Sequence, residues 1–126
     1  MPTLGRQLVG VFYDVYQELG HGFLEHTYQR AMQIAVRQCG LHCEREVPVT
    51  VFFRGEAVGE YRADLVVAAA VIIECKTAVK IVPAHQAQLL NYLKASEYNV
   101  GLILNFGVQP SFKRMIYETA RIRDCG

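Results

Sequence analysis

Residues 61–76, YRADLVVAAAVIIECK, decide how this chain folds. Two β-branched, apolar stretches, 61–67 and 71–76, flank the short connection Ala68-Ala69-Ala70, so we expect an antiparallel hairpin. Near the connection both stretches are apolar at consecutive positions, which is typical of strands that are buried on both faces. The segment therefore predicts two central strands of a sheet.

This hairpin carries two carboxylates, Asp64 in the first strand and Glu74 in the second. Because the connection is short, we expect the two side chains to lie close together, and alternation puts Glu74 and Lys76 on one face. Adjacent carboxylates in an apolar sheet repel each other, and a hard divalent cation with oxygen ligands relieves that repulsion. Lys76 would then lie beside the metal and a scissile phosphate, where it could orient water or stabilise negative charge. The alternative is structural, a salt bridge at the edge of the sheet.

Two helices are expected before the hairpin. Residues 4–19 have apolar side chains at steps of three and four, and Gly20-His21-Gly22 ends this pattern. A second helix is expected over about 24–38, before Gly40. The apolar face predicted for the second helix consists of Leu24, Tyr28, Ala31, Met32, Ala35 and Val36.

Strand patterns surround the hairpin. Val47 to Phe53 alternate with period two before a turn at Arg54-Gly55, and Val100 to Asn105 reads as a buried strand. A helix over 84–94 follows Pro83, and Phe112 to Tyr117 favours a short strand over a helix. The element order ααβββαβ(β) predicts an α/β fold, with a mixed central β-sheet flanked by helices.

Four more polar residues are candidates for a site. Glu25 lies in the first turn of the second helix, where a carboxylate is also favoured simply by the helix dipole. Gln88 and Tyr92 are one helical turn apart, so an amide and a phenol could face a substrate backbone, or else form a half-buried helix face. His85 is a candidate phosphate contact, or an ordinary polar residue.

Composition limits the class of protein. The chain has 126 residues, 52% of them hydrophobic and 20% charged, so we expect one globular domain over residues 1–126. The net charge of +1 lacks the basic excess of proteins that bind nucleic acid through its backbone, so any such contact needs a local patch or a metal. The longest apolar run, 65–73, is too short to cross a membrane, and residues 1–10 do not resemble a signal peptide.

Cysteine spacing indicates the redox environment. Cys39, Cys43, Cys75 and Cys125 form neither a CxxC pair nor a secreted disulfide pattern, so we expect reduced thiols and a cytoplasmic location. The alternative for Cys39, His42 and Cys43 is a zinc site completed by distant ligands.

Together these motifs resemble the GxxExxY family, which is placed in the PD-(D/E)XK nuclease superfamily. The order of the motifs is also similar to that of RecB-type nuclease domains, and the resemblance extends from about Leu8 to Tyr117. The stretches that carry it are Gly22-x-x-Glu25-x-x-Tyr28, Tyr61-Arg62-Ala63-Asp64, Ile73-Glu74-Cys75-Lys76, the segment from His85 to Lys94, and the segment from Gly101 to Gly107.

The resemblance implies a restriction-endonuclease-like core and a set of roles. Glu25, Asp64 and Glu74 would bind Mg²⁺ or Mn²⁺, with the Cys75 backbone carbonyl as a further ligand. Lys76 would be the catalytic lysine. Gln88 and Tyr92 would support the site.

Two functions follow from these expectations. The first is metal-dependent hydrolysis of phosphodiester bonds in nucleic acid, DNA rather than RNA, with a homodimer or a protein partner assisting substrate selection. The second is a catalytically silent nuclease-like module that binds nucleic acid or a regulatory protein partner.

Overall fold

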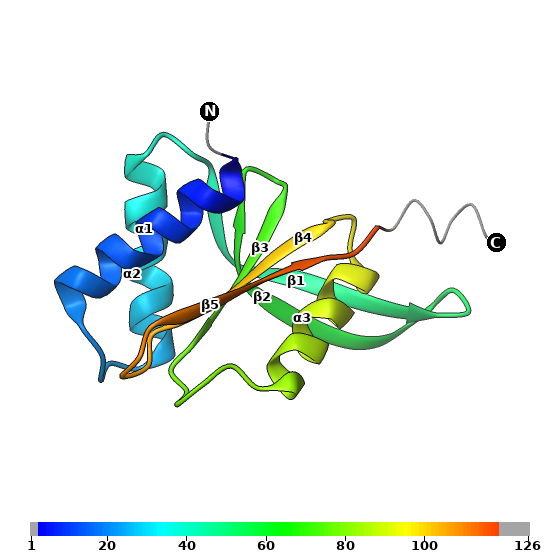
Figure 1. Cartoon of the computed structure of the whole chain (residues 1–126). Helices are drawn as coiled ribbons and strands as arrows, with labels where there is room; N and C mark the ends of the chain where they lie inside the picture. The colour runs from blue at the N-terminus through cyan, green and yellow to red at the C-terminus, as the bar shows by residue number, and fades with distance from the viewer. Residues whose placement is uncertain (1–2, 119–126) are drawn as a thin grey trace.

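A computed structural model describes residues 3–118 of the chain. The order of elements, ααβββαββ, is the predicted one, and the segment that was ambiguous between strand and helix is the last strand (Figure 1). The elements are α1 (Leu4–Leu19), α2 (Glu25–Gln38), β1 (Cys43–Phe53), β2 (Glu56–Val67), β3 (Val71–Lys76), α3 (Pro83–Ala95), β4 (Val100–Asn105) and β5 (Ser111–Ile116).

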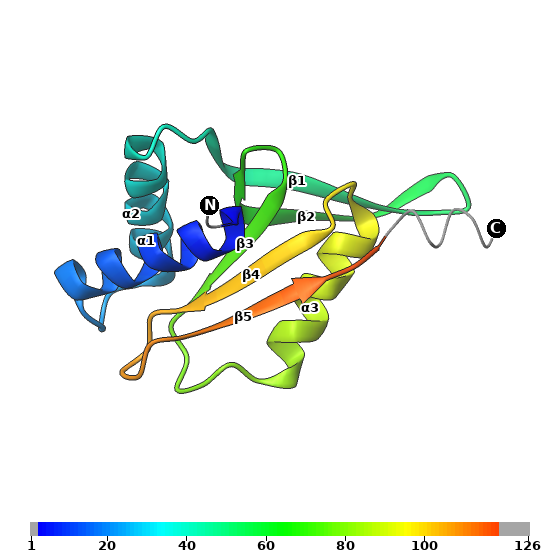
Figure 2. The same cartoon turned by 45° about the horizontal axis from the view of Figure 1, so that its top comes forward.

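The strands form one mixed sheet in the order β1-β2-β3-β4-β5. Neighbouring strands are antiparallel except β3 and β4, which are parallel and are connected through α3. Helices α1 and α2 pack on one face of the sheet and α3 on the other (Figure 2). The predicted mixed sheet with flanking helices, and the interior positions of β2 and β3, are therefore confirmed.

Two apolar clusters lie on the two faces of the sheet. Ile73 belongs to the cluster under α1 and α2, and its neighbour Ile72 belongs to the cluster under α3. Both side chains are fully buried, because alternation sends them to opposite faces that are each covered by helices. This is the physical reason for the consecutive apolar residues in β3.

One residue of the predicted apolar face of α2 is placed differently. Leu24 is 71% exposed, whereas Tyr28, Met32 and Val36 are buried. The prediction was wrong for Leu24 because it precedes the helix in an extended conformation, with φ −74° and ψ 157°. Its side chain therefore leaves the face that the helical residues share.

The first two strands are longer than predicted, and they form a hairpin that projects beyond the rest of the sheet (Figure 2). β2 pairs with β1 from Glu56 to Val67, but it pairs with β3 only at Leu65, Val66 and Val67. Residues 47–63 of β1 and β2 therefore form a hairpin arm that pairs only with itself. The sheet forks where β2 leaves β3, at Asp64 and Glu74.

Among the described residues, no helix combines the length and the apolar character needed to cross a membrane.

Candidate active site at the fork of the sheet

At the fork, carboxylates replace the backbone ladder between β2 and β3. The Asp64 backbone N–H donates to Glu74 Oε1 over 3.3 Å, and the Cys75 backbone N–H donates to Asp64 Oδ2 over 2.8 Å. The hairpin thus brings the two predicted carboxylates together. Their oxygens satisfy backbone donors that have lost their partners across the fork.

These two carboxyl groups are poorly hydrated. Burial, together with the nearby charge of Asp64, raises the pKa of Glu74 to about 9. Burial also raises the pKa of Asp64, although the hydrogen bond from Cys75 acts in the opposite direction. The two side chains are hydrogen-bonded to each other, so the pair holds a proton between them at neutral pH.

Lys76 does not form the salt bridge that was the structural alternative. Within residues 3–118, the one ion pair shorter than 4.0 Å joins His42 to Glu44, far along the sequence from this lysine. Lys76 Nζ donates instead to Gln88 Oε1 over 3.2 Å, and β3 is an interior strand rather than an edge. The Gln88 amide therefore orients Lys76, and no carboxylate of residues 3–118 forms an ion pair with its ammonium group.

Helix α3 supplies the side chains that hold Lys76. Gln88 Nε2 donates to the Tyr92 hydroxyl over 3.1 Å, so the lysine, the amide and the phenol form one chain of hydrogen bonds. The helix is held close to the sheet at Gly101, where a Cβ atom would approach the Leu89 side chain to 2.8 Å. The structure thus brings together Asp64, Glu74, Lys76, Gln88 and Tyr92.

Glu25 is less closely associated with the other carboxylates. Its side chain is exposed at the first residue of α2, and in the part of the chain that the structure describes no three His, Cys, Asp or Glu side chains form a ready metal cluster. Its charge nevertheless acts on the buried Cys75 thiol, the neighbour of Glu74. Glu25 therefore lies near enough to Cys75 to act on it electrostatically, but it does not complete a three-carboxylate cluster among the described residues.

The other residues of the Gly22-x-x-Glu25-x-x-Tyr28 motif hold the start of α2. The Tyr28 hydroxyl donates to the Gly20 carbonyl over 2.6 Å and accepts from the Phe23 N–H over 3.2 Å. The Tyr28 ring stacks on Phe106, with centroids 4.3 Å apart. Gly22 has φ +111°, a conformation that glycine adopts without strain. These contacts determine where Glu25 begins its helix.

His85 has a local contact. Its Nδ1 accepts the Val82 backbone N–H over 3.2 Å, which satisfies a free donor at the start of α3. The role of His85 as a phosphate contact stays a prediction.

Sequence reasoning missed Gln29 and Glu46, which adjoin Asp64. Gln29 is buried, its Nε2 donates to Glu46 Oε1 over 3.1 Å, and its side chain also hydrogen-bonds to Asp64. Gln29 lies one helical turn after Glu25, and this spacing could have identified it. Glu46 has φ +56° inside β1, and no sequence pattern indicates that conformation.

Asn105 and Gly107 were also missed, and they hold the loop after Lys76. The buried Asn105 side chain accepts the Ala78 N–H over 2.9 Å and donates to the Ala78 carbonyl over 3.0 Å. A Cβ atom on Gly107 would overlap that same carbonyl oxygen. Asn105 is the last residue of β4 and pairs with Lys76, and Gly107 follows the strand, so the two residues fix the course of the chain as it leaves the site.

Comparison with known proteins identifies the family. Residues 2–115 match the model of the PD-(D/E)XK nuclease superfamily. The chain belongs to this superfamily. Among curated proteins, none matches the chain in sequence.

Two solved structures support the same fold for this superfamily member. An alkaline exonuclease from Laribacter hongkongensis, LHK-Exo, has a TM-score of 0.54 and 12% identity, over 98% of this chain and 75% of the exonuclease. The structure of SSO0001 has a TM-score of 0.50 and 14% identity, over 96% of this chain and 82% of the other. At these identities the likeness concerns the fold alone.

The superfamily generally uses divalent metal ions, and the donors at the fork fit such an ion. Asp64 and Glu74 supply carboxylate oxygens, which Mg²⁺ and Mn²⁺ prefer. A strand residue directs its N–H and C=O to the same side, so the Cys75 carbonyl faces the fork as its N–H does. Gln29 Oε1 is buried beside Asp64 with no partner among the described residues, and the water shell of a metal ion could donate to it.

Within residues 3–118 of this superfamily member, Cys39, His42 and Cys43 do not form the alternative zinc site. Cys43 is buried in the core, Cys39 is exposed, and His42 contacts Glu44. Burial raises the pKa of the Cys43 and Cys75 thiols, which disfavours the thiolate that zinc requires. Cys125 lies outside the described residues.

Proposed function

We propose that this chain is a Mg²⁺- or Mn²⁺-dependent nuclease that hydrolyses phosphodiester bonds in nucleic acid, DNA rather than RNA. The observation that carries the proposal is the pair of hydrogen-bonded carboxyl groups at the fork, within a fold of the PD-(D/E)XK nuclease superfamily. Burying two ionised carboxylates together is costly unless a cation is bound beside them. The narrower resemblance to the GxxExxY family supports the same proposal.

The residues at the fork have different roles in this proposal. Asp64, Glu74 and the Cys75 carbonyl would hold the metal, with Glu25 joining through its own side chain or through water. A divalent ion at this position supplies a Lewis acid that polarises the phosphate and acidifies a bound water. Lys76 stabilises the negative charge that develops on the phosphate, because Gln88 holds its ammonium group toward the fork. Tyr92 holds Gln88 in turn.

A second candidate is a catalytically silent module that binds nucleic acid or a regulatory protein partner. The net charge of +1 favours it, since backbone binding alone usually relies on a basic surface. The separation of Glu25 from a three-carboxylate cluster favours it as well. In either case a homodimer or a protein partner could extend the binding surface.

The free thiols of Cys39, Cys43 and Cys75 support a cytoplasmic location.

Replacing Lys76 separates the two candidates. We expect Lys76→Met to lower single-turnover cleavage of DNA in Mn²⁺ by about 100- to 1000-fold, the usual cost of one preorganised charged donor. DNA binding in Ca²⁺ should fall far less, because ground-state contacts are distributed over the surface. The matched control is Lys80→Met, since Lys80 is an exposed lysine in the following loop.

Two results would contradict the proposal. Equal cleavage by Lys76→Met and Lys80→Met would remove Lys76 from the mechanism. A wild-type protein that binds DNA but cleaves neither single strands nor duplex in Mg²⁺ or Mn²⁺ would establish the silent module.

A further inference from the structure

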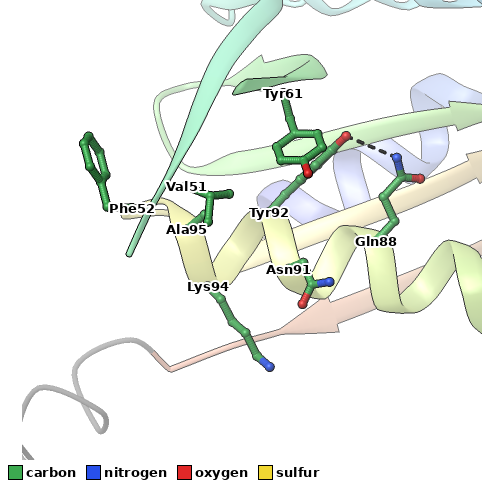
Figure 3. A pocket seen from close by; sticks show the side chains of 8 residues that line it. All are labelled: Val51, Phe52, Tyr61, Gln88, Asn91, Tyr92, Lys94 and Ala95. Atoms are coloured by element: carbon green, nitrogen blue, oxygen red, sulfur yellow. Dashed lines mark hydrogen bonds between the residues drawn. The ribbon is translucent and has the colours of Figure 1, made fainter. Parts of the chain in front are cut away.

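A groove lies between the hairpin arm and α3, beside the fork. It has a volume of about 570 Å³, and one wall comes from β1 and β2 while the other comes from α3 (Figure 3). It exists because β2 leaves β3 at the fork, so the arm stands apart from the rest of the sheet and faces the helix. Neither the superfamily match nor the candidate active site assigns a role to it.

Aromatic side chains line this groove. Tyr61 on the arm faces Tyr92 on α3, with ring centroids 5.9 Å apart and planes tilted by 44° (Figure 3). The Tyr61 ring is 49% exposed, whereas the Phe52 ring, 65% exposed at the end of the groove, points away from Tyr61 and Tyr92 (Figure 3). Exposed aromatic rings of this kind are platforms on which nucleobases stack, whatever the base.

The α3 wall adds polar groups at helical spacing. Gln88, Asn91 and Lys94 recur every three residues along one side of the helix. Amides can bond to the edges of a base, and an ammonium group can bond to a phosphate. Lys94 directs its ammonium group away from Tyr61 and Tyr92, to 5.9 Å from the centroid of the Tyr117 ring, so the rings and the amides carry the match to a nucleotide (Figure 3).

The groove is continuous with the candidate active site. Gln88 lines the groove, and the same side chain accepts from Lys76 and donates to Tyr92. A nucleotide whose base occupied the groove would therefore have its neighbouring phosphate near Lys76 and the carboxylates of the fork.

We propose that this groove binds an unpaired nucleotide, and that the substrate is DNA with a single-stranded segment rather than intact duplex. This inference rests on the proposed function and specifies its substrate. The groove has the volume of a small-ligand pocket, which suits a nucleotide and excludes a double helix. Stacking also provides affinity without the basic surface that the chain lacks.

The test measures binding in Ca²⁺, separately from cleavage. The probes are a fluorescein-labelled oligothymidylate and the blunt duplex that it forms with oligoadenylate. We expect the wild type to bind the single strand at least about tenfold more tightly than the duplex, and Tyr61→Ala to weaken that binding by about 5- to 100-fold. Tyr61→Phe should retain the affinity because it retains the ring.

The matched control is Val58→Ala, an exposed apolar side chain on the same arm outside the groove. It should leave binding unchanged, and thermal unfolding of every variant checks that the arm remains folded. A second readout uses a single strand that contains 2-aminopurine. Its fluorescence should be quenched by the wild type and by Tyr61→Phe, but less by Tyr61→Ala.

The two proposals fail differently. Selective binding of the single strand that depends on Tyr61, without cleavage by the wild type, would retain the groove and reject the hydrolysis. Equal affinity for single strand and duplex, or an unchanged affinity in Tyr61→Ala, would overturn the groove proposal even if the protein cleaves DNA. Failure of the wild type to bind the oligothymidylate would also overturn it.

Discussion

At the scale of single residues, Glu74 links protonation to folding. Its carboxyl group has a pKa of about 9 in the folded protein, against an ordinary value of 4.5. Between these values the folded state binds more protons than the unfolded state, so the free energy of unfolding decreases as pH rises. The stabilisation is complete below the unfolded pKa, and it is lost progressively on the way to the folded pKa.

We therefore expect the metal-free protein to become less stable from pH 5 to pH 8. The slope from this one group cannot exceed about 1.4 kcal/mol per pH unit. Urea unfolding in EDTA at several pH values measures it, and Glu74→Gln should flatten the curve. Glu56→Gln, at an exposed position on the arm, should retain the slope. If the free energy of unfolding of the wild type were independent of pH over this range, the protonated state of the buried Glu74 carboxyl group would be contradicted.

Asp64 has an electrostatic role and a hydrogen-bonding role, and two substitutions separate them. In chelator, Asp64→Asn should leave the free energy of unfolding unchanged or raise it, because it removes a charge that is costly to bury and retains an acceptor for the Cys75 N–H. Asp64→Ala should lower it by about 1–3 kcal/mol, because the buried N–H loses its partner. Chemical denaturation in EDTA compares the two. A large loss of stability in Asp64→Asn would favour a purely structural carboxylate.

At the scale of elements, Gly107 connects the end of β4 to the loop after β3. Gly107→Ala should lower the free energy of unfolding by about 1–3 kcal/mol, since the new methyl group must displace the Ala78 backbone beside Asn105. The matched control is Gly10→Ala. Gly10 lies in α1 with no atom within 4 Å of its added Cβ, so that substitution should stabilise the helix by about 0.5–1 kcal/mol. Urea unfolding of both variants gives the comparison, and similar effects at the two sites would show that the close approach at Gly107 is not required.

The elements themselves were largely predictable because their determinants are local. Helix α1 and strands β3 and β4 begin and end where periodicity and glycine predict, and the turn at Arg54-Gly55 is confirmed. The starts of β1 and β2 were missed, because those residues are stabilised by pairing between β1 and β2, at the base of the arm for β1 and within the arm for β2, rather than by an apolar alternation of their own. The proximity of Asp64 and Glu74 followed from the short connection between their strands.

Other features of the site depend on contacts between distant segments. Gln29 reaches Asp64 from α2, Asn105 reaches Ala78 from β4, and Glu46 adopts a positive φ within a strand. The spacing of Gln29 after Glu25 could have indicated its helix face, but no period or spacing within one element specifies these partners. They follow from the packing of α2 and β4 against β3, which a single sequence does not specify.

At the scale of the whole molecule, the fork explains why the site and the groove adjoin. β2 contributes its last three residues to the pairing with β3, and its remaining length forms the arm opposite α3 (Figure 2). Asp64 and Glu74 lie where β2 diverges from β3, and the groove lies in the space between the arm and α3. One irregularity of the sheet therefore generates the charged cluster and the space beside it.

The fork also predicts how metal binding couples to the stability of the whole domain. A divalent ion bound by Asp64 and Glu74 displaces the proton that the pair holds, so its affinity should increase with pH. At a concentration about 100 times the dissociation constant, an ion that binds only the folded state adds about 2.7 kcal/mol to the free energy of unfolding. We expect Mg²⁺ or Mn²⁺ to raise the melting temperature, by more at pH 8 than at pH 6.

Calorimetry in two buffers of different ionisation enthalpy should detect the proton that is released when the ion binds. Asp64→Asn should abolish both the thermal shift and the proton release, whereas Glu56→Gln should retain both. The absence of any shift at millimolar Mg²⁺ or Mn²⁺ would reject the metal site. A shift without proton release would place the ion away from Glu74. Rising pH destabilises the metal-free domain, because the buried Glu74 must then ionise. A bound ion would compensate that charge, so we expect the ion to contribute most to the free energy of unfolding at alkaline pH.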